Sequence, residues 1–515
     1  MAQALAGLRD KMTVLVKKSQ YGQYTALPEN VSQAELDRRS RVWAARHRAL
    51  IKVTLSAMLL TAVALFLTNL RRSNAAEPCD GVKAGFQCET DISHSWGQYS
   101  PFFTVPSTIS ASVPGECEIT FAQVLSRHGA RDPTAGKTAS YAALVDKIHS
   151  NVTEYSKAYE FIKDYEYTLG ADQLTVFGQQ QLINSGIKFY QRYEKLARTI
   201  SPYVRSAGQE RVVESALNWT QGFHQARLSD KNSKSPDTYP YDILVIPEAS
   251  TSNNTLSPDT CTSFKEGTDY GSEAQGIWAG VFTPKIAERV NENLSGVNLT
   301  SQEIIYLMDL CPFNTVADTQ GQLSPFCNLF TVEEWNDYDY YLSLGMWYRD
   351  ASYTDRDALG PTQGVGFVNE LIARLTSQPV VDHTTTNTTL DGSNSTFPLG
   401  SILYADFSHD NDMVTMFSAM GLYNTTKSLS KTTRQSVEET NGFSASWVVP
   451  FAARMYVEKL SCTGQDEELV RVLVNDRVIP LQNCGADAEG RCTVSRFVDS
   501  LTFATGGGNW DLCYE

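Results

Sequence analysis

Apolar and polar positions follow two different spacings along this chain. Strand-forming apolar residues fill 118–125, and shorter runs of the same kind occupy 401–406 and 469–474. Between about 137 and 335 the pattern is mostly helical, and residues 182–199 have the spacing of an amphipathic helix. A further helix is predicted over 413–422, directly after the strand at 401–406. The pattern therefore predicts strands towards both ends of the chain and helices between them.

One apolar segment is long enough to cross a membrane. Residues 53–67 carry no charge, and their apolar neighbours extend the span to 49–70, about 22 residues, which can just cross a bilayer. Six basic residues precede this span or lie at its start, whereas only Arg71 and Arg72 follow it closely. This bias places the N-terminus in the cytosol. We therefore predict a disordered cytosolic tail (1–48), a transmembrane signal anchor (49–70) and a single-pass type II membrane protein with an extracellular body. The alternative is cleavage near residues 73–76, which would release a secreted protein.

The charge of the chain is divided unevenly between its two parts. Residues 1–72 hold 12 Lys and Arg against 4 Asp and Glu, whereas the remaining 443 hold 31 against 54. A body this acidic lacks the basic surface that nucleic acids require, so we exclude a nucleic-acid partner. It also repels anionic ligands unless a binding cleft is locally basic.

Cysteines and glycosylation sequons agree with an extracellular body. All ten cysteines lie beyond residue 78, on one side of the apolar segment, and this predicts disulfides in an oxidising compartment, against the alternative of free buried thiols. Their spacing leaves the connectivity open. Sequons within the body predict glycosylation at eight asparagines: Asn151, Asn218, Asn253, Asn293, Asn298, Asn387, Asn394 and Asn424.

Residues 126–133 read Ser-Arg-His-Gly-Ala-Arg-Asp-Pro and carry the clearest chemical signal. His128 stands between Arg127 and Arg131, directly after the strand predicted at 118–125. Two guanidinium groups match phosphate oxygens in pairs, and their charge should depress the pKa of His128 and keep its imidazole neutral. A neutral imidazole can attack phosphorus. Gly129 would allow a close approach to a ligand or an unusual backbone conformation. The alternative is a surface loop whose arginines pair with carboxylates.

A second polar segment follows the strand predicted at 401–406. His409 is placed to donate a hydrogen bond to a bound phosphate, and Asp410 to protonate the leaving alcohol. The alternative role for Asp410 is to cap the following helix. Arg205, within 203–208, is a third candidate for phosphate binding, although its spacing alone carries little weight. The seven histidines show no metal-ligand spacing, so we expect neither a metal nor a cofactor.

Taken together, these segments resemble the histidine acid phosphatases, and the fungal phytase branch most closely. Arg-His-Gly-Ala-Arg-x-Pro at 127–133 is similar to the nucleophile motif of that family, and His409-Asp410 to its proton-donor motif. Segments 169–175, 185–190, 204–208, 359–364 and 472–478 also match, and the resemblance runs from about Cys79 to Cys513. It implies catalysis by His128 through a phosphohistidine, with Asp410 as the acid. It also implies phosphate binding by Arg127, Arg131, Arg205 and His409.

The resemblance also implies a fold and a disulfide pattern. The fold is α/β, with a phosphoglycerate-mutase-like sheet domain flanked by helices (117–155 and 336–515), a smaller inserted helical domain (156–335) and a lead-in arm (73–116). The implied disulfides are Cys79–Cys88, Cys117–Cys462, Cys261–Cys513, Cys311–Cys327 and Cys484–Cys492.

The chain departs from the resemblance around the expected pocket. Lys137 stands alone where relatives tend to carry a lysine cluster, residues 344–347 fall where they often have paired lysines, and Asp132 replaces a common tyrosine. These changes remove positive charge and leave the catalytic set intact. We predict a phytase of the 3-phytase type that acts on myo-inositol hexakisphosphate, with a broad-specificity acid phosphatase as the alternative. A non-catalytic binding protein is disfavoured by the intact His128, His409 and Asp410, and a mutase-like phosphohistidine enzyme by the secretory features.

Overall fold

The computed structural model describes residues 80–82, 84–235, 237–352 and 358–515. Residues 78–515 form one compact unit. The predicted membrane span at 49–70 lies outside the described residues. Among the helices that are described, none is both long and apolar enough to cross a bilayer.

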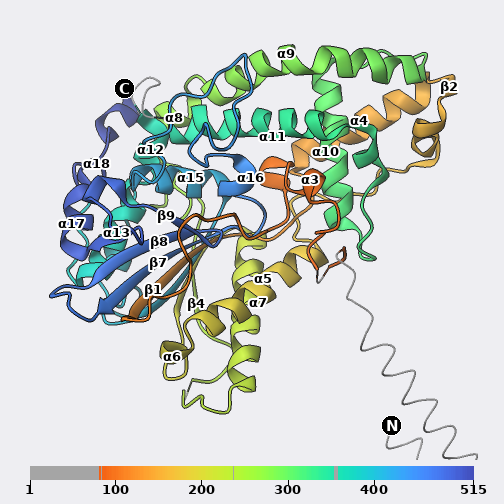
Figure 1. Cartoon of the computed structure of the whole chain (residues 1–515). Coiled ribbons are helices and arrows are strands. Elements are labelled where there is room, and N and C mark those ends of the chain that lie inside the picture. The colour runs from red at the N-terminus through yellow and green to blue at the C-terminus, as the bar shows by residue number, and fades with distance from the viewer. Residues whose placement is uncertain (1–79, 83, 236, 353–357) are drawn as a thin grey trace, which may run out of the picture. The chain divides into compact units, whose positions relative to one another are not determined.

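A mixed sheet forms the centre of the unit (Figure 1), with the strand order β10-β8-β7-β1-β6-β3-β4 and β9 paired to β8. Neighbouring strands in the half β1-β6-β3-β4 are parallel, and those in the half from β1 to β10 are antiparallel. The strands are β1 (Cys117–Arg127), β3 (Tyr203–Ala207), β4 (Ile243–Ile246), β6 (Leu403–Ser408), β7 (Arg454–Cys462), β8 (Leu469–Val474), β9 (Arg477–Ile479) and β10 (Cys492–Thr493). The strands predicted at 118–125, 401–406 and 469–474 are therefore present as β1, β6 and β8.

Helices cover both faces of this sheet. Asp406 and Phe407 are successive residues of β6, so their side chains point to opposite faces. Phe407 contacts Trp219 of α7 (Glu210–Ser229), which packs against α5 (Val176–Arg192). Asp406 pairs with Arg374 of α13 (Val365–Thr376). The sheet flanked by helices, as predicted, is confirmed.

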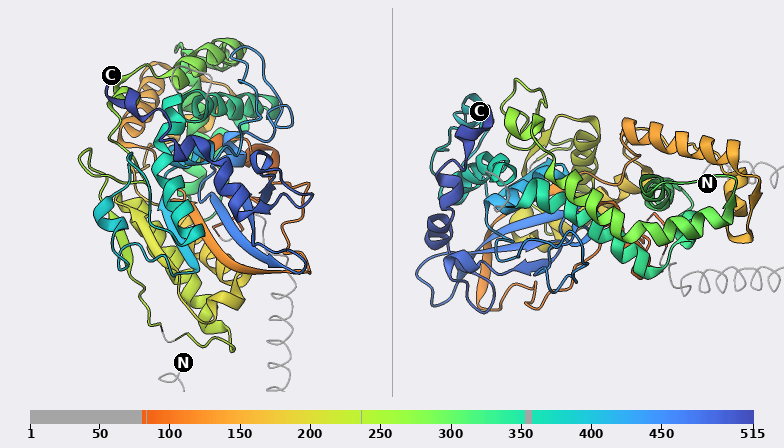
Figure 2. Two further views of the ribbon diagram at one scale, coloured as in Figure 1. Left: turned by 90° about the vertical axis from the view of Figure 1, so that its left-hand side faces the viewer. Right: turned by 90° about the horizontal axis from the view of Figure 1, so that it is seen from above.

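Long helices form a separate layer beyond the sheet (Figure 2). They are α4 (Ala135–Asn151), α9 (Tyr270–Asn293), α10 (Ser301–Ala317) and α11 (Val332–Met346), and α9 packs against both α10 and α11. The predicted boundary of the helical insert needs correction here. Residues 156–335 contain β3 and β4, which are strands of the main sheet, together with α5 and α7, which pack together beside it. The helical layer is therefore smaller than the predicted insert.

Shorter elements connect these layers. The short strands β2 (Glu154–Tyr155) and β5 (Leu294–Ser295) pair with each other. Short helices are α3 (Thr90–Ser93), α6 (Glu194–Ala197), α8 (Thr262–Glu266), α12 (Leu359–Gln363), α14 (Thr388–Asp391), α15 (Asp410–Ala419), α16 (Ala445–Val448), α17 (Val494–Ser500) and α18 (Thr502–Thr505). Short helices of other types are η1 (Gly97–Tyr99), η2 (Lys157–Asp164), η3 (Pro325–Leu329), η4 (Trp347–Ala351), η6 (Gln482–Cys484) and η7 (Trp510–Tyr514).

Disulfides tie distant parts of the unit together. Cys117–Cys462, Cys261–Cys513, Cys311–Cys327 and Cys484–Cys492 are all formed, so four of the five implied pairs are confirmed. Cys88 is also in a disulfide, and Cys79, its expected partner, lies outside the described residues. Each of the eight asparagines predicted to be glycosylated has solvent-exposed surface, so the glycosylation prediction stays compatible with the fold.

Candidate active site

Two predicted motifs meet where neighbouring parallel strands end. β1 and β6 pair in register with Arg127 opposite Ser408, and β3 pairs with the other side of β6. The residues that follow these strands share one edge of the sheet, which is the edge where open α/β sheets bind ligands. His128 follows β1, and His409 and Asp410 follow β6. The ring centroids of the two histidines are 5.6 Å apart.

His128 has one ring nitrogen free to react. Its Nδ1 lies 2.8 Å from the carbonyl oxygen of Gly129, and donation of its proton there leaves the lone pair on Nε2. Nε2 is buried and has no hydrogen-bond partner among the described residues. Burial is the main reason that the pKa of His128 lies well below its ordinary value. Four nearby side chains lower this pKa further: Arg127, Arg131, Arg211 and His409. The imidazole is therefore neutral at acidic pH and carries an unshared electron pair.

Arg127 is fully buried and held from two sides. Its Nη1 donates to the carbonyl oxygens of Gln98 and Val449, the latter at 2.7 Å. Its Nη2 lies 2.9 Å from Oδ2 of Asp410, and its guanidinium carbon lies 4.6 Å from the ring centroid of Phe451. Burial lowers the pKa of Arg127 to about 10, which still leaves it charged at acidic and neutral pH. A fixed, buried guanidinium of this kind is suited to an anionic ligand.

Gly129 is required by close packing of the backbone. A Cβ atom at this position would lie 2.3 Å from the carbonyl oxygen of Gly178 in α5. The contact is with a helix of the protein, and the backbone of Gly129 is not left-handed, so the unusual backbone conformation considered for this glycine is not observed. The next residues are held in the same way, since the amide of Ala130 donates to Gln181 of α5 at 2.9 Å. Arg131 is 7% exposed. α5 therefore holds the loop that carries His128.

His409 has a carboxylate partner that the sequence analysis missed. Its Nε2 lies 3.1 Å from Oε1 of Glu248, and both side chains are almost buried. Glu248 follows β4, so it reaches the site from the end of the fourth parallel strand. It also accepts a hydrogen bond from the amide of Gln209 at 2.8 Å. Burial alone would raise the pKa of Glu248, but the hydrogen bond from His409 outweighs it and keeps the pKa below its ordinary value. An ionised Glu248 accepts a hydrogen bond from His409 and so fixes the orientation of its ring.

Asp410 begins the helix that follows β6. The helix α15 starts at Asp410 and its N-cap is His409, so Asp410 does not have the capping position considered for it. Burial favours the neutral carboxyl group and by itself would raise its pKa. Four positive neighbours outweigh burial and hold the pKa of Asp410 below its ordinary value: Arg127, Arg131, His409 and Arg211. Asp410 is therefore ionised in the empty site and is coupled electrostatically to the groups that would bind phosphate.

Arg205 lies elsewhere than predicted. It is on β3, 1% exposed, with Nε 2.8 Å from Oδ1 of Asp406 and Nη2 2.6 Å from Oε2 of Glu370. Arg374 pairs with the same Asp406 at 2.6 Å. These groups form a closed ion-pair network on the α13 side of the sheet. Both ends of the Arg205 guanidinium are bound to carboxylates, so this residue does not contribute a free cation to the site.

Arg211 is the third arginine at the site, and the sequence analysis missed it. It is the second residue of α7, in the turn that follows the end of β3. Its positive charge lowers the pKa values of both His128 and Asp410. Its own pKa is lowered by burial and then by Arg131, and its Nη1 lies 3.3 Å from Oδ1 of Asp172. The signal that could have identified it is its place after a parallel strand, which is shared with His128.

A cavity of about 210 Å³ adjoins this cluster. Its lining includes Asn411, the neighbour of Asp410, and Gln98, whose carbonyl group binds Arg127. Residues Gly345 and Met346 contribute uncharged surface. Among the described lining residues Arg349 is the only basic one, and its Nη1 lies 3.2 Å from Oδ2 of Asp269. The cavity therefore offers mainly neutral surface beside a positively charged centre.

Arginine and histidine side chains provide the positive charge of the site. Within the described part of the chain, no three His, Cys, Asp or Glu residues are grouped as metal ligands would be. The site therefore combines a neutral histidine nitrogen, three arginines and an acidic side chain, an arrangement suited to transfer of a phosphoryl group.

Sequence comparisons agree with this arrangement. The model of the histidine phosphatase superfamily (branch 2) matches residues 118–475, which include His128, His409, Asp410 and the three arginines of the site. The chain belongs to this family. This histidine phosphatase is 53% identical to "Phytase A" of Aspergillus oryzae over 442 residues, which cover 85% of this chain and 94% of that relative. It is 49% identical to "Phytase A" of Aspergillus fumigatus over 447 residues, 86% of this chain and 95% of the relative.

Solved structures share the fold of this histidine phosphatase. The crystal structure of the phytase from D. castellii superposes with a TM-score of 0.66 at 22% identity, covering 82% of this chain and 88% of that one. A multiple inositol polyphosphate phosphatase of Bifidobacterium longum, in complex with inositol hexasulfate, gives a TM-score of 0.57 at 14% identity, covering 79% and 97%. The mixed sheet with flanking helices is therefore a fold that these proteins have in common.

Proposed function

We propose that this histidine phosphatase is a phytase, which releases phosphate from myo-inositol hexakisphosphate through a phosphohistidine intermediate. The observation that carries the proposal is the state of His128. Its Nε2 has no partner among the described residues, its proton is directed to Nδ1, and burial together with the surrounding arginines keeps the ring neutral. A histidine in this state is a nucleophile beside a site for an anion.

In the first step, Nε2 of His128 attacks the phosphorus atom and the bond from phosphorus to the ester oxygen breaks. The leaving alkoxide takes a proton from Asp410, and Arg127, Arg131 and Arg211 stabilise the charge on the phosphoryl oxygens. The low pKa of Asp410 in the empty site is due to those same arginines. A bound phosphate cancels their charge, so substrate binding raises the pKa of Asp410 and lets it carry the proton.

In the second step, water attacks the phosphohistidine. Asp410, now ionised, accepts a proton from the water as the bond between Nε2 and phosphorus breaks, and inorganic phosphate leaves. His409 donates to a phosphate oxygen, and Glu248 holds the ring of His409 in place through the contact at 3.1 Å. Both reaction steps balance in atoms and charge, and neither step uses a metal ion or a cofactor.

The substrate is proposed from the relatives and from the surroundings of the site. Phytase A proteins match this chain over most of their length. The charges of Lys137, Arg131 and Asp410 all influence the pKa of the buried Tyr99, so Lys137 lies close to the site. The broad-specificity alternative is favoured by a different observation. Among its described lining residues, Arg349 is the only cation of the adjoining cavity, and Asp269 partly neutralises it.

One experiment tests both the reaction and the substrate. The purified full chain is assayed with phytate and with a small phosphomonoester, alongside the variant His128→Ala. We expect hydrolysis of phytate with a higher kcat/KM than that of the small ester, and loss of both activities in the variant with unchanged thermal unfolding. Full activity of the variant would refute the nucleophile. Equal kcat/KM values for the two substrates would favour the broad-specificity enzyme.

We also infer that the body is extracellular and tethered by residues 49–70, with release after cleavage as the alternative. The disulfides of the body support an oxidising compartment. Extraction of membranes with alkaline carbonate tests the tether. An anchored enzyme stays in the membrane pellet, whereas phosphatase activity found only in the culture medium would contradict the anchor.

A further inference from the structure

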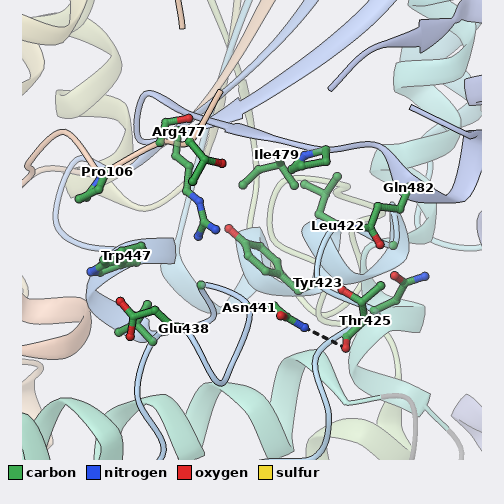
Figure 3. A pocket seen from close by; sticks show the side chains of 17 residues that line it. Pro106, Leu422, Tyr423, Thr425, Glu438, Asn441, Trp447, Arg477, Ile479 and Gln482 are labelled. Carbon is green, nitrogen blue, oxygen red and sulfur yellow. Dashed lines mark hydrogen bonds between the residues drawn. The ribbon is translucent and has the colours of Figure 1, made fainter. Parts of the chain in front are cut away.

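A second cavity, of about 640 Å³, lies apart from the active-site residues (Figure 3). Its walls come from the lead-in arm, the segments that follow α15, the helix α16 and the hairpin of β8 and β9. None of the site residues described above lines it. The phosphatase mechanism leaves this cavity without a role.

Arg477 extends into the cavity with an unsatisfied donor. Its Nη1 is buried and has no hydrogen-bond partner among the described residues. The guanidinium lies directly against the backbone of Gly442, since a Cβ at that glycine would come within 1.6 Å of Nη1. Its carbon lies 5.4 Å from the ring centroid of Trp447. A buried donor of this kind is costly unless a ligand or water accepts from it.

Aromatic and polar side chains surround the guanidinium. Figure 3 shows Trp447 and Tyr423 on two sides of Arg477, with Asn441, Glu438 and Thr425 further into the cavity. Flat aromatic faces beside hydroxyl, amide and carboxylate groups are suited to a ligand that has both apolar and hydroxyl-bearing faces. Sugars have this character.

Asn424 lines the same cavity and begins a sequon with Thr425 and Thr426. It is exposed, and its Nδ2 donates to Oδ1 of Asn483 at 2.9 Å. A glycosylated asparagine amide keeps one N–H, so this hydrogen bond is compatible with modification. Of the eight sequon asparagines, all of which the structure describes, only Asn424 borders this cavity.

We propose that the N-linked glycan on Asn424 folds back into this cavity and is part of the folded structure. The acetamide carbonyl of the first N-acetylhexosamine accepts from the guanidinium group of Arg477, and the apolar face of a sugar ring packs on Trp447 or Tyr423. The tether favours this occupant, because attachment at the rim makes binding intramolecular and gives the sugar a high effective concentration. The proposal is independent of the phosphatase chemistry.

Site-resolved deglycosylation tests the proposal. The full chain is secreted from a eukaryotic host and treated in its native state with a peptide N-glycosidase, and release at each asparagine is followed by mass spectrometry. We expect release at Asn424 to be about tenfold slower than at the exposed Asn394, which corresponds to about 1.4 kcal/mol of protection. In Trp447→Ala and in Arg477→Ala the release at Asn424 should approach that at Asn394.

Trp510→Ala serves as the matched control, since Trp510 lies in η7 and does not line the cavity. It should leave release at Asn424 slow. Retained activity on a small phosphomonoester shows that each variant is folded. Hydrogen exchange gives a second readout, because Asn424→Gln should speed exchange of the amides in residues 437–442. An unoccupied Asn424, or release there as fast as at Asn394 in the unaltered chain, would overturn the proposal.

Discussion

At the scale of single residues, Arg205 and Arg211 lie six positions apart and have different surroundings. Arg205 is enclosed by Asp406 and Glu370 inside the protein, whereas Arg211 acts on His128 and Asp410. The Arg-His-Gly motif could be recognised from sequence, because a histidine flanked by arginines after a strand has a direct chemical meaning. Arg211 was harder to recognise. Its place after a strand is a signal only once that strand is known to run parallel to β6, and a charged residue early in a helix otherwise has the same pattern as an exposed surface position.

Arg211→Ala should move the pH profile of kcat/KM to higher pH. Loss of this positive charge raises the pKa of His128, so the ring becomes neutral only at a higher pH and the acidic limb moves up. It also raises the pKa of Asp410, so the acid stays protonated to a higher pH and the alkaline limb moves up too. Loss of one donor to the transition state lowers kcat/KM by about 10²-fold.

The control is Arg434→Ala, which removes an arginine that pairs with Glu333 and Asp337 and does not line the site. Its pH profile should stay in place. An unmoved profile in Arg211→Ala would mean that Arg211 does not act on these two groups.

Arg205→Ala should affect stability rather than catalysis. Removal of one partner from a buried ion-pair network leaves Asp406 and Glu370 without part of their compensation, which costs about 3–5 kcal/mol. Denaturant unfolding measures this loss, and inhibition by inorganic phosphate measures binding. A stable variant with weakened phosphate inhibition would instead support the role first predicted for Arg205.

At the scale of elements, α5 determines where the nucleophile loop lies. Gly178 of α5 and Gly129 approach so closely that neither position has room for a side chain. The sequence pattern predicted a helix at 182–199, whereas α5 begins at Val176 because the side chain of Thr175 accepts from the amide of Gly178 at 3.1 Å. Caps of this kind depend on local geometry, so the pattern of apolar residues placed the helix but not its start.

Gly178→Ala should therefore lower both activity and stability. A Cβ there would lie 2.0 Å from the carbonyl oxygen of Ala130, and this backbone cannot move without displacing His128. Overpacking of this kind costs about 1–3 kcal/mol. Thermal unfolding and kcat on a small phosphomonoester measure the two effects.

The matched control is Gly280→Ala in α9, where a Cβ has no heavy atom within 4 Å. It should leave activity unchanged and stabilise its helix by up to about 1 kcal/mol. Similar effects of the two substitutions would contradict the role given to the contact between α5 and the nucleophile loop.

At the scale of the whole molecule, the order of the strands was beyond the reach of the sequence pattern. The pattern found β1, β6 and β8, which are well buried. It missed β3 and β4, which have only five and four residues, and so placed part of the sheet in the helical insert. Glu248 was missed for the same reason, because its role depends on β4 ending beside β3 and β6.

The central place of β1 also has a consequence for how the enzyme is made. β1 lies between β6 and β7, and its Cys117 is joined to a cysteine 345 residues later. Sheets built from such distant segments form slowly, because the chain loses the entropy of closing a long loop before the strand pairing contributes any stabilising energy. During synthesis His128 emerges early, but Asp410 and the carbonyl of Val449 that holds Arg127 emerge late. The growing chain is therefore inactive. Hydrolysis begins only after nearly all of the chain has entered the compartment where it folds.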